Sequence, residues 1–189
     1  MGYDPVVLTV DKEDISRLDS KMDDSPLEEL TTEGIQIIRI PSGQPYRLIS
    51  LFQRLRLYRF LWTFFYPWFW ERYSFWPKSA FVQALDLVDA LDIRLIYSSS
   101  APYTAMDLAY RLKKRRPDLK WVNDIRDPWT EHFGWTWPSK LHWHIARRME
   151  KRFLGASDHV VVVSREMKRF YTERGLVPDE RISEITNAY

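Results

Sequence analysis

The sequence predicts an α/β fold in which helices flank a mostly parallel sheet. Short apolar runs rich in β-branched residues alternate with longer segments whose apolar residues recur at helical spacing. This alternation indicates βαβ units, whose strands run parallel and whose crossovers are right-handed. Two polar stretches, at 98–103 and 123–129, each follow one of the apolar runs. Ligands of open α/β sheets bind beyond the carboxyl ends of the strands, so these stretches mark the predicted site.

The N-terminal part of the chain holds two predicted strands separated by a polar segment. Residues 5–10 and 34–40 are short, apolar and β-branched, and a Pro-Ser-Gly turn at 41–43 closes the second run. Residues 11–24 are acidic and lack an apolar period, which predicts a solvated loop. Residues 26–30 are expected to form one helical turn.

The middle of the chain predicts two helices and two strands. Ser79 is a preferred N-cap residue, and the helix expected after it has an apolar face formed by Phe81, Leu85, Val88 and Leu91. Residues 93–97 are the third strand, and residues 98–102 are the turn after it. The next helix has an apolar face formed by Ala105, Leu108, Ala109 and Leu112. The cations at 113–116 suit the negative, C-terminal end of the dipole of this helix, and Pro117 ends it. Residues 119–122 are the fourth strand.

The C-terminal part repeats the alternation. Pro138 suits the first turn of a long helix that Leu141, Ile145, Met149 and Phe153 make amphipathic. Residues 159–163 are the fifth strand. Ser164 is expected to cap a helix that ends before Gly175 and turns inward Met167, Phe170 and Tyr171. Residues 182–186 are the last strand.

Composition excludes several classes of protein. A chain of 189 residues with 45% hydrophobic and 29% charged residues is typical of one soluble globular domain. A net charge of +2 gives no general field for nucleic acid, and the absence of cysteine excludes disulfides and thiolate metal sites. We find no signal peptide. The longest uncharged aromatic run, 60–70, has 11 residues and contains Pro67, whereas spanning a bilayer takes ~20 apolar residues.

The two polar stretches admit a structural and a functional interpretation. Serines and Pro102 are typical of a helix start, yet the free N–H groups of that turn also suit an anionic or hydroxyl-rich ligand. Asp124, Arg126 and Asp127 either pair internally or bind sugar hydroxyls or a leaving-group phosphate. No further ligands lie near the two carboxylates, so no metal site is predicted. Trp129 is expected on a loop, where an exposed ring favours binding.

Residues 46–76 mix arginines with many aromatic residues. This composition suits a membrane surface, where rings lie at headgroup depth and arginines meet lipid phosphates. Burial under the sheet or against a partner is the alternative interpretation.

Four motifs in order resemble those of family 4 glycosyltransferases, which have the two-domain GT-B fold. Residues 98–105, SSSAPYTA, resemble the S-S-P-P-x-S/T-A turn of that family, and residues 121–129, WVNDIRDPW, resemble its W-x-x-D-x-R-D-P/L-W segment. Residues 156–164, ASDHVVVVS, are similar to its A-D-x-V-x-x-V-S strand. Residues 182–187 resemble the strand that leads to N-G-x-D and the second domain.

The resemblance implies a Rossmann-like N-terminal, acceptor-side domain that is clipped at both ends, with residues 1–189 forming one incomplete domain. The usual first strand, its glycine-rich loop and its first helix are missing, so a gap is expected between the strands at 6–10 and 93–97. The donor-binding C-terminal domain is absent as well. The fragment alone is therefore expected to be inactive.

The resemblance also implies roles for individual residues. The parent protein would transfer a hexose from a nucleotide-sugar donor to a glycan or lipid-linked acceptor, without a metal or other cofactor. The acceptor would meet Ser99, Ser100 and Tyr103 and stack on Trp129. The catalytic floor would be shaped by Asp124, Arg126 and Asp127, and the interdomain boundary would lie at Asn187.

Envelope polysaccharide synthesis and a cytoplasmic location, peripheral to the membrane through 46–76, would fit this assignment. Two other functions stay open at this point. One is a non-catalytic, membrane-associated α/β interaction module that docks a partner through its tryptophans. The other is a GT-B sugar-nucleotide epimerase, although the four histidines offer little for its chemistry.

Overall fold

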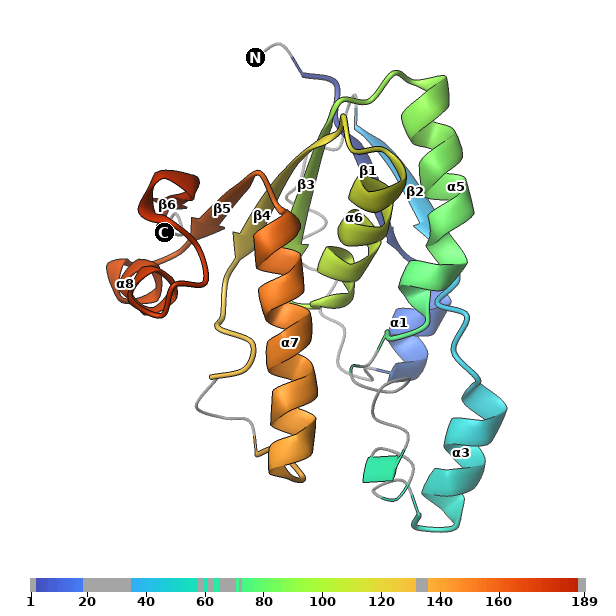
Figure 1. Ribbon diagram of the computed structural model, residues 1–189. Helices are drawn as coiled ribbons and strands as arrows, with labels where there is room; N and C mark the ends of the chain where they lie inside the picture. The colour runs from blue at the N-terminus through green and yellow to red at the C-terminus, as the bar shows by residue number, and fades with distance from the viewer. Residues whose placement is uncertain are drawn as a thin grey trace.

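The computed structural model describes residues 3–18, 35–57, 60, 63–64, 71, 73–131 and 136–186. Within them, strands form two parallel sheets with helices packed on them (Figure 1). The smaller sheet pairs β1 (Val6–Val10) with β2 (Gln36–Ile40). The larger sheet has the order β3 (Leu95–Ser100), β4 (Lys120–Ile125), β5 (His159–Val162) and β6 (Ile182–Glu184). All these pairings are parallel, which confirms the predicted α/β class.

Helices connect the strands. They are α1 (Lys12–Leu18), α3 (Tyr46–Arg54), α5 (Trp76–Ala90), α6 (Thr104–Arg115), α7 (Lys140–Ala156) and α8 (Arg165–Glu173), with a 3₁₀ turn at Asp179–Arg181. Figure 1 shows α5, α6 and α7 next to one another on one side of the strands, and α6 contacts both of the others. From α5 onward the alternation of helices and strands follows the sequence prediction, whereas α3 was not predicted.

Two local predictions ahead of β3 were wrong. The loop expected at 11–24 contains α1, because the Asp11 carbonyl accepts from the Ile15 N–H at 3.1 Å and starts a helix too short to have an apolar period. The rest of that stretch, and the helical turn expected at 26–30, lie outside the described residues. Ser79 does not cap α5, since its hydroxyl donates to the Pro41 carbonyl at 2.8 Å and the helix begins at Trp76. The cap at Ser164 is confirmed by a 3.2 Å bond from the Met167 N–H.

A gap separates the two sheets, as the resemblance implies. Among the described residues, β1 pairs only with β2, and β3 pairs only with β4. A cavity of about 470 Å³ lies between the facing edges and is lined mainly by apolar residues of β1, β3, α5 and α6. Its walls include Val6 and Leu8 on one side and Ile96 and Tyr97 on the other. The fold is therefore Rossmann-like, and no strand from the part of the chain that the structure describes fills the middle of its sheet.

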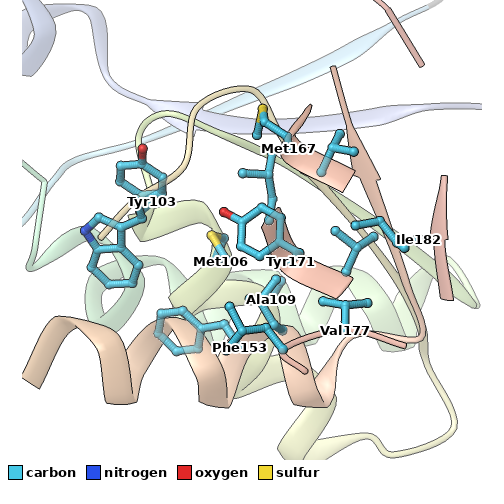
Figure 2. Packing of buried hydrophobic residues seen from close by; sticks show 14 of the residues in the cluster. Tyr103, Met106, Ala109, Phe153, Met167, Tyr171, Val177 and Ile182 are labelled. Atoms are coloured by element: carbon cyan, nitrogen blue, oxygen red, sulfur yellow. The ribbon is translucent and has the colours of Figure 1, made fainter. Parts of the chain in front are cut away.

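The main core lies between the larger sheet and helices α6, α7 and α8. Figure 2 shows Tyr103, Met106 and Phe153 facing Tyr171 and Ile182 across it. A second cluster joins β1 and β2 to α5 and α6. These two clusters fix α6 on both of its sides, so the start of α6 is held firmly at the carboxyl edge of β3.

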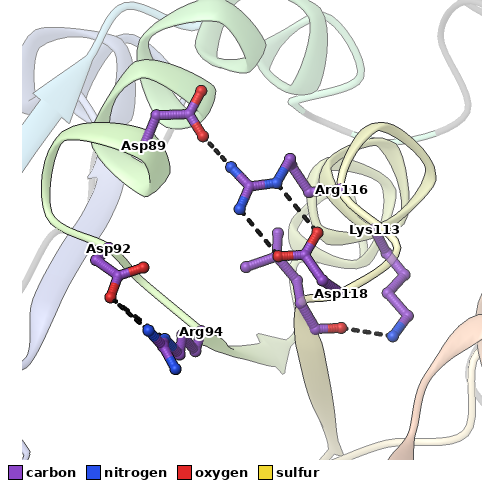
Figure 3. Close-up of polar contacts among 7 residues, drawn as sticks. Asp89, Asp92, Arg94, Lys113, Arg116 and Asp118 are labelled. Atoms are coloured by element: carbon purple, nitrogen blue, oxygen red, sulfur yellow. Dashed lines mark hydrogen bonds and ion pairs between the residues drawn. The ribbon is translucent and has the colours of Figure 1, made fainter.

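Ion pairs tie the helices together at the opposite, amino-terminal edge of the sheet. Arg116 follows α6 and pairs with Asp118 at 2.9 Å and with Asp89 of α5 (Figure 3). Lys113 pairs with Asp158 at 2.8 Å, which joins the end of α6 to the turn before β5. The basic cluster at 113–116 therefore serves the end of a helix, and it is far along the strands from the polar stretches.

Candidate functional site

The candidate site begins inside two strands and not in the turns after them. The sequence predicts that the third and fourth strands end at residues 97 and 122, but β3 continues to Ser100 and β4 to Ile125. The parallel ladder pairs Ser99 with Asp124 and Ser100 with Ile125. Ladder hydrogen bonds hold these polar residues in the strands, where composition alone predicts a turn.

Strand alternation sends the serines to different faces. Ser98 and Ser100 are buried on the helix-covered face. Ser98 accepts from the Trp121 indole at 2.8 Å, and Ser100 donates to the Asp124 carbonyl at 3.2 Å. The Ser100 hydroxyl is thus fully buried and bonded to backbone, and its contact with an acceptor stays a prediction.

Ser99 lies on the other face with Asp124 and Arg126. The Ser99 hydroxyl donates to the Asp124 carboxylate at 2.9 Å, and the Arg126 guanidinium donates to the same oxygen at 3.4 Å. Asp124 is 3% exposed, whereas the Arg126 side chain is 51% exposed. The internal Arg–carboxylate pair is thus present, and the Arg126 side chain is still half exposed at the sheet edge.

Tyr97 is a neighbour that the sequence reasoning missed. It lies two residues before Ser99 on the same face of β3, is 60% exposed, and lines the cavity between the sheets. Partial burial, together with a hydrogen bond to the Asp124 carboxylate, raises the pKa of Tyr97 to about 12. The period of two along the strand is the signal that could have linked Tyr97 to the site.

Trp129 and Tyr103 lie in the core and not at the surface. They are 1% and 2% exposed, and their rings stack with centroids 5.0 Å apart and planes 13° from parallel. Trp129 also lies parallel to the Phe153 ring of α7, at 6.1 Å. Packing in the core therefore buries both rings in this structure, and the stacking of Trp129 on a sugar and the contact of Tyr103 with the acceptor stay predictions.

Tyr103 instead links the two turns of the site. Its hydroxyl donates to the Asp127 carbonyl at 3.2 Å, while the Asp127 side chain is exposed. Burial, and then the negative charges of Asp127, Glu71 and Glu150, raise the pKa of Tyr103 far above its ordinary value. The phenol therefore stays a neutral hydrogen-bond donor.

A buried polar network lies beneath the Asp127 turn. Glu150 of α7 is 1% exposed and accepts from the Thr130 hydroxyl at 2.5 Å, from Arg147 at 3.0 Å and from the Tyr171 hydroxyl at 3.3 Å. Burial, followed by the Glu150 charge, raises the pKa of Tyr171 well above its ordinary value. The network holds the end of the Asp–Arg–Asp segment against α7 and α8.

Glu71 is the second residue that the sequence reasoning missed. Its carboxylate accepts from the N–H groups of Tyr103 and Thr104, at 2.8 and 2.7 Å, at the start of α6. These N–H groups belong to the turn that, from the sequence, is expected to bind an anionic or hydroxyl-rich ligand. No local pattern could identify Glu71, which precedes Tyr103 by 32 residues and lies in the aromatic segment.

The described part of the aromatic-basic segment has an exposed apolar face. Leu48, Leu51 and Leu55 share one side of α3 and its end, all exposed, while Ile49 is buried against the rest of the molecule. No described helix is long and apolar enough to cross a bilayer. Among the described residues, no three His, Cys, Asp or Glu side chains form a group able to hold a metal ion. Asn187 lies outside the described residues.

Comparison with known proteins agrees with the motif resemblance. A family model described as a glycosyl transferase 4-like domain matches residues 1–188. No curated protein matches the chain.

Proposed function

The chain belongs to the family of glycosyl transferase 4-like domains, and from this premise we propose that it forms the acceptor side of a hexosyltransferase that uses a nucleotide sugar. The observation that carries the proposal is the Ser99–Asp124–Arg126 cluster. It lies at the carboxyl edge of a parallel sheet, where such folds bind their ligands.

In the proposed reaction, the oxygen of an acceptor hydroxyl bonds to the anomeric carbon of the donor sugar while the bond from that carbon to the nucleotide's phosphate oxygen breaks. The leaving phosphate takes up the proton of the acceptor hydroxyl. Asp124 orients Arg126 and Ser99, because both donate to its buried carboxylate. A guanidinium suits a phosphate group, and the exposed Asp127 carboxylate suits sugar hydroxyls. By resemblance to the family, transfer needs no metal ion.

We also propose that the domain is incomplete by itself. In parallel sheets both edges of an inner strand are normally paired, whereas here β1 and β3 face a cavity. A strand between them would join the two sheets. The donor would bind mainly to a second domain, so the chain alone would not catalyse transfer.

The exposed face of α3 supports a lipid-linked acceptor. Leu48, Leu51 and Leu55 offer apolar area, and Arg47 and Arg54 on the same helix offer cations. This pairing suits a surface of anionic lipid. We therefore propose that the protein lies on the cytoplasmic face of a membrane and acts in envelope polysaccharide synthesis.

The test is nucleotide release from a panel of nucleotide sugars by the full-length protein, with a membrane lipid extract as the source of acceptor and with a chelator present. Wild type should release nucleotide from one of the sugars. Asp124→Asn should lower that rate by about 100-fold, the size seen when one preorganised polar group is lost. Asp118→Asn, at the opposite end of the strands, should leave it unchanged. Equal rates in all three proteins would refute the assignment of the site.

A further inference from the structure

Glu71 holds the first turn of α6 from outside the helix. Its two carboxylate oxygens accept from consecutive backbone N–H groups, those of Tyr103 at 2.8 Å and Thr104 at 2.7 Å. Both residues that donate are buried, and Thr104 is fully so. The contact is a two-point bond between a charged group and the positive end of a helix, which is a strong form of hydrogen bond.

The next two N–H groups of this turn donate to carbonyl groups of the same turn. The Ala105 N–H donates to the Pro102 carbonyl at 3.3 Å, and the Met106 N–H donates to the Tyr103 carbonyl at 3.0 Å. The N-cap residue, Tyr103, contributes no side-chain cap. Glu71 therefore supplies the capping that a local Ser, Thr or Asp usually gives a helix.

Glu71 is itself held in a tight turn that leads into α5. Its N–H donates to the Ser74 hydroxyl at 2.8 Å, and its carbonyl accepts from the Ser74 N–H at 3.2 Å. Helix α5 begins at Trp76 and packs along α6. The carboxylate is thus attached to a packed element.

The turn that Glu71 caps is bonded to the candidate site on its other side. The Tyr103 hydroxyl donates to the Asp127 carbonyl at 3.2 Å, and the Arg126 N–H donates to the Ser100 carbonyl at 3.1 Å. A shift of the turn at 100–104 would therefore move the backbone of Arg126 and Asp127.

We propose that Glu71 is a positioning residue of the site, which fixes the turn at 100–104 and, through it, the Asp–Arg–Asp segment. The chain's own carboxylate takes the place that these N–H groups would offer to an anionic ligand. A ligand phosphate is consequently held by other groups. This inference concerns the geometry of the site and is independent of whether glycosyl transfer is the reaction.

The test is residue-resolved amide hydrogen exchange on the full chain. In Glu71→Ala, the N–H groups of Tyr103 and Thr104 should exchange at least tenfold faster, and that of Arg126 should follow. The N–H groups of β5 should keep their rates, which a general loss of stability would not allow. Sodium acetate should restore protection in Glu71→Ala by filling the vacated position, whereas sodium chloride at equal ionic strength should not. Glu173→Ala, which removes an exposed carboxylate at the end of α8, is the matched control.

Unchanged protection at Tyr103 and Thr104 would overturn the proposal, and so would equal losses throughout the chain or the lack of an acetate effect. If Glu71→Ala does not fold, Glu71→Gln gives the same answer. Its amide has one acceptor oxygen and can serve one N–H group at most. One of the two N–H groups should then exchange at least tenfold faster, and an unchanged pair would contradict the proposal.

Discussion

Ser99 of β3 donates a hydrogen bond to Asp124 of β4 across 2.9 Å, and the two residues are direct partners in the parallel ladder. The pair joins a hydroxyl on the outer face of the sheet to a carboxylate that is almost fully buried. Arg126 donates to the same carboxylate oxygen at 3.4 Å. One cross-strand contact therefore links the register of the sheet to the charge arrangement of the site.

Replacing Ser99 should test that link. Ser99→Ala removes one donor from the Asp124 carboxylate, and a hydrogen bond to a charged group contributes about 1.5–3 kcal/mol. We expect the free energy of unfolding, measured by denaturant titration, to decrease by an amount in that range. The transfer rate of the full-length protein, measured by nucleotide release, should decrease about tenfold or more. Ser16→Ala on α1, also exposed, is the control. Full activity in Ser99→Ala would mean that Asp124 needs no orientation from β3.

Trp129 should matter for stability and not for stacking on sugar. Trp129→Ala removes a ring packed beside Tyr103 and Phe153 and should cost about 3–5 kcal/mol of unfolding free energy. Trp129→Phe keeps part of that packing and should cost less, with acceptor affinity unchanged. Calorimetry and acceptor titration measure both quantities. If Trp129→Phe folds as stably as wild type yet loses acceptor affinity, the ring contacts the acceptor after all.

Asp158 should make the free energy of unfolding depend on pH in the acid range. Burial by itself raises the pKa of Asp158, but hydrogen bonds from Lys113 and from the Trp121 N–H outweigh it, so the pKa is lowered from 3.8. The unfolded chain then binds this proton more readily than the folded one. The stabilisation from Asp158 is present above its unfolded pKa and is lost as pH falls through the folded pKa.

The measurement is the difference in unfolding free energy between wild type and Asp158→Asn as a function of pH. It should be constant down to about pH 5 and shrink below about pH 4. Asp86→Asn, an exposed carboxylate on α5, is the control. A difference that grows on acidification would contradict the assigned direction of the shift.

The exposed leucines of α3 should carry membrane binding. Burying a leucine side chain is worth about 1.5–3 kcal/mol, so Leu51→Ser combined with Leu55→Ser should weaken binding to anionic vesicles at least tenfold. Vesicle sedimentation measures the binding, and Val82→Ser, which changes another exposed apolar residue, on α5, is the control. If both variants bind as wild type does, α3 does not contact the membrane.

The sequence is sufficient to predict the strands and their succession along the chain, because each strand has an apolar centre bounded by polar or breaking residues. It does not locate the ends of β3 and β4, since serines, Asn123 and Asp124 are typical of turns. Those residues stay in the strands because of ladder pairing and because Trp121 donates to Ser98. Both contacts join segments that are distant in the sequence, so the composition of either segment alone cannot predict them.

The site could be predicted at the level of the sheet edge but not residue by residue. Arg126 donates a hydrogen bond to Asp124, which is the internal pair that the sequence left open. The side chains of Ser100, Tyr103 and Trp129 are buried. Whether a residue that follows a strand is exposed depends on which helix packs against it, and here that helix is α7. Glu71 reaches the site across 32 residues of chain, which no local period or spacing could indicate.

The most direct measurement of the central claim is the rate of sugar transfer by the full-length protein carrying Arg126→Ala, compared with Arg94→Ala. Both arginines pair with an aspartate two residues earlier, but Arg94 precedes β3 whereas Arg126 follows β4. The account predicts at least a 100-fold loss for Arg126→Ala and none for Arg94→Ala, in line with the loss of one charged group from an active site. Equal rates for the two variants would contradict it and would move the reaction away from this edge of the sheet.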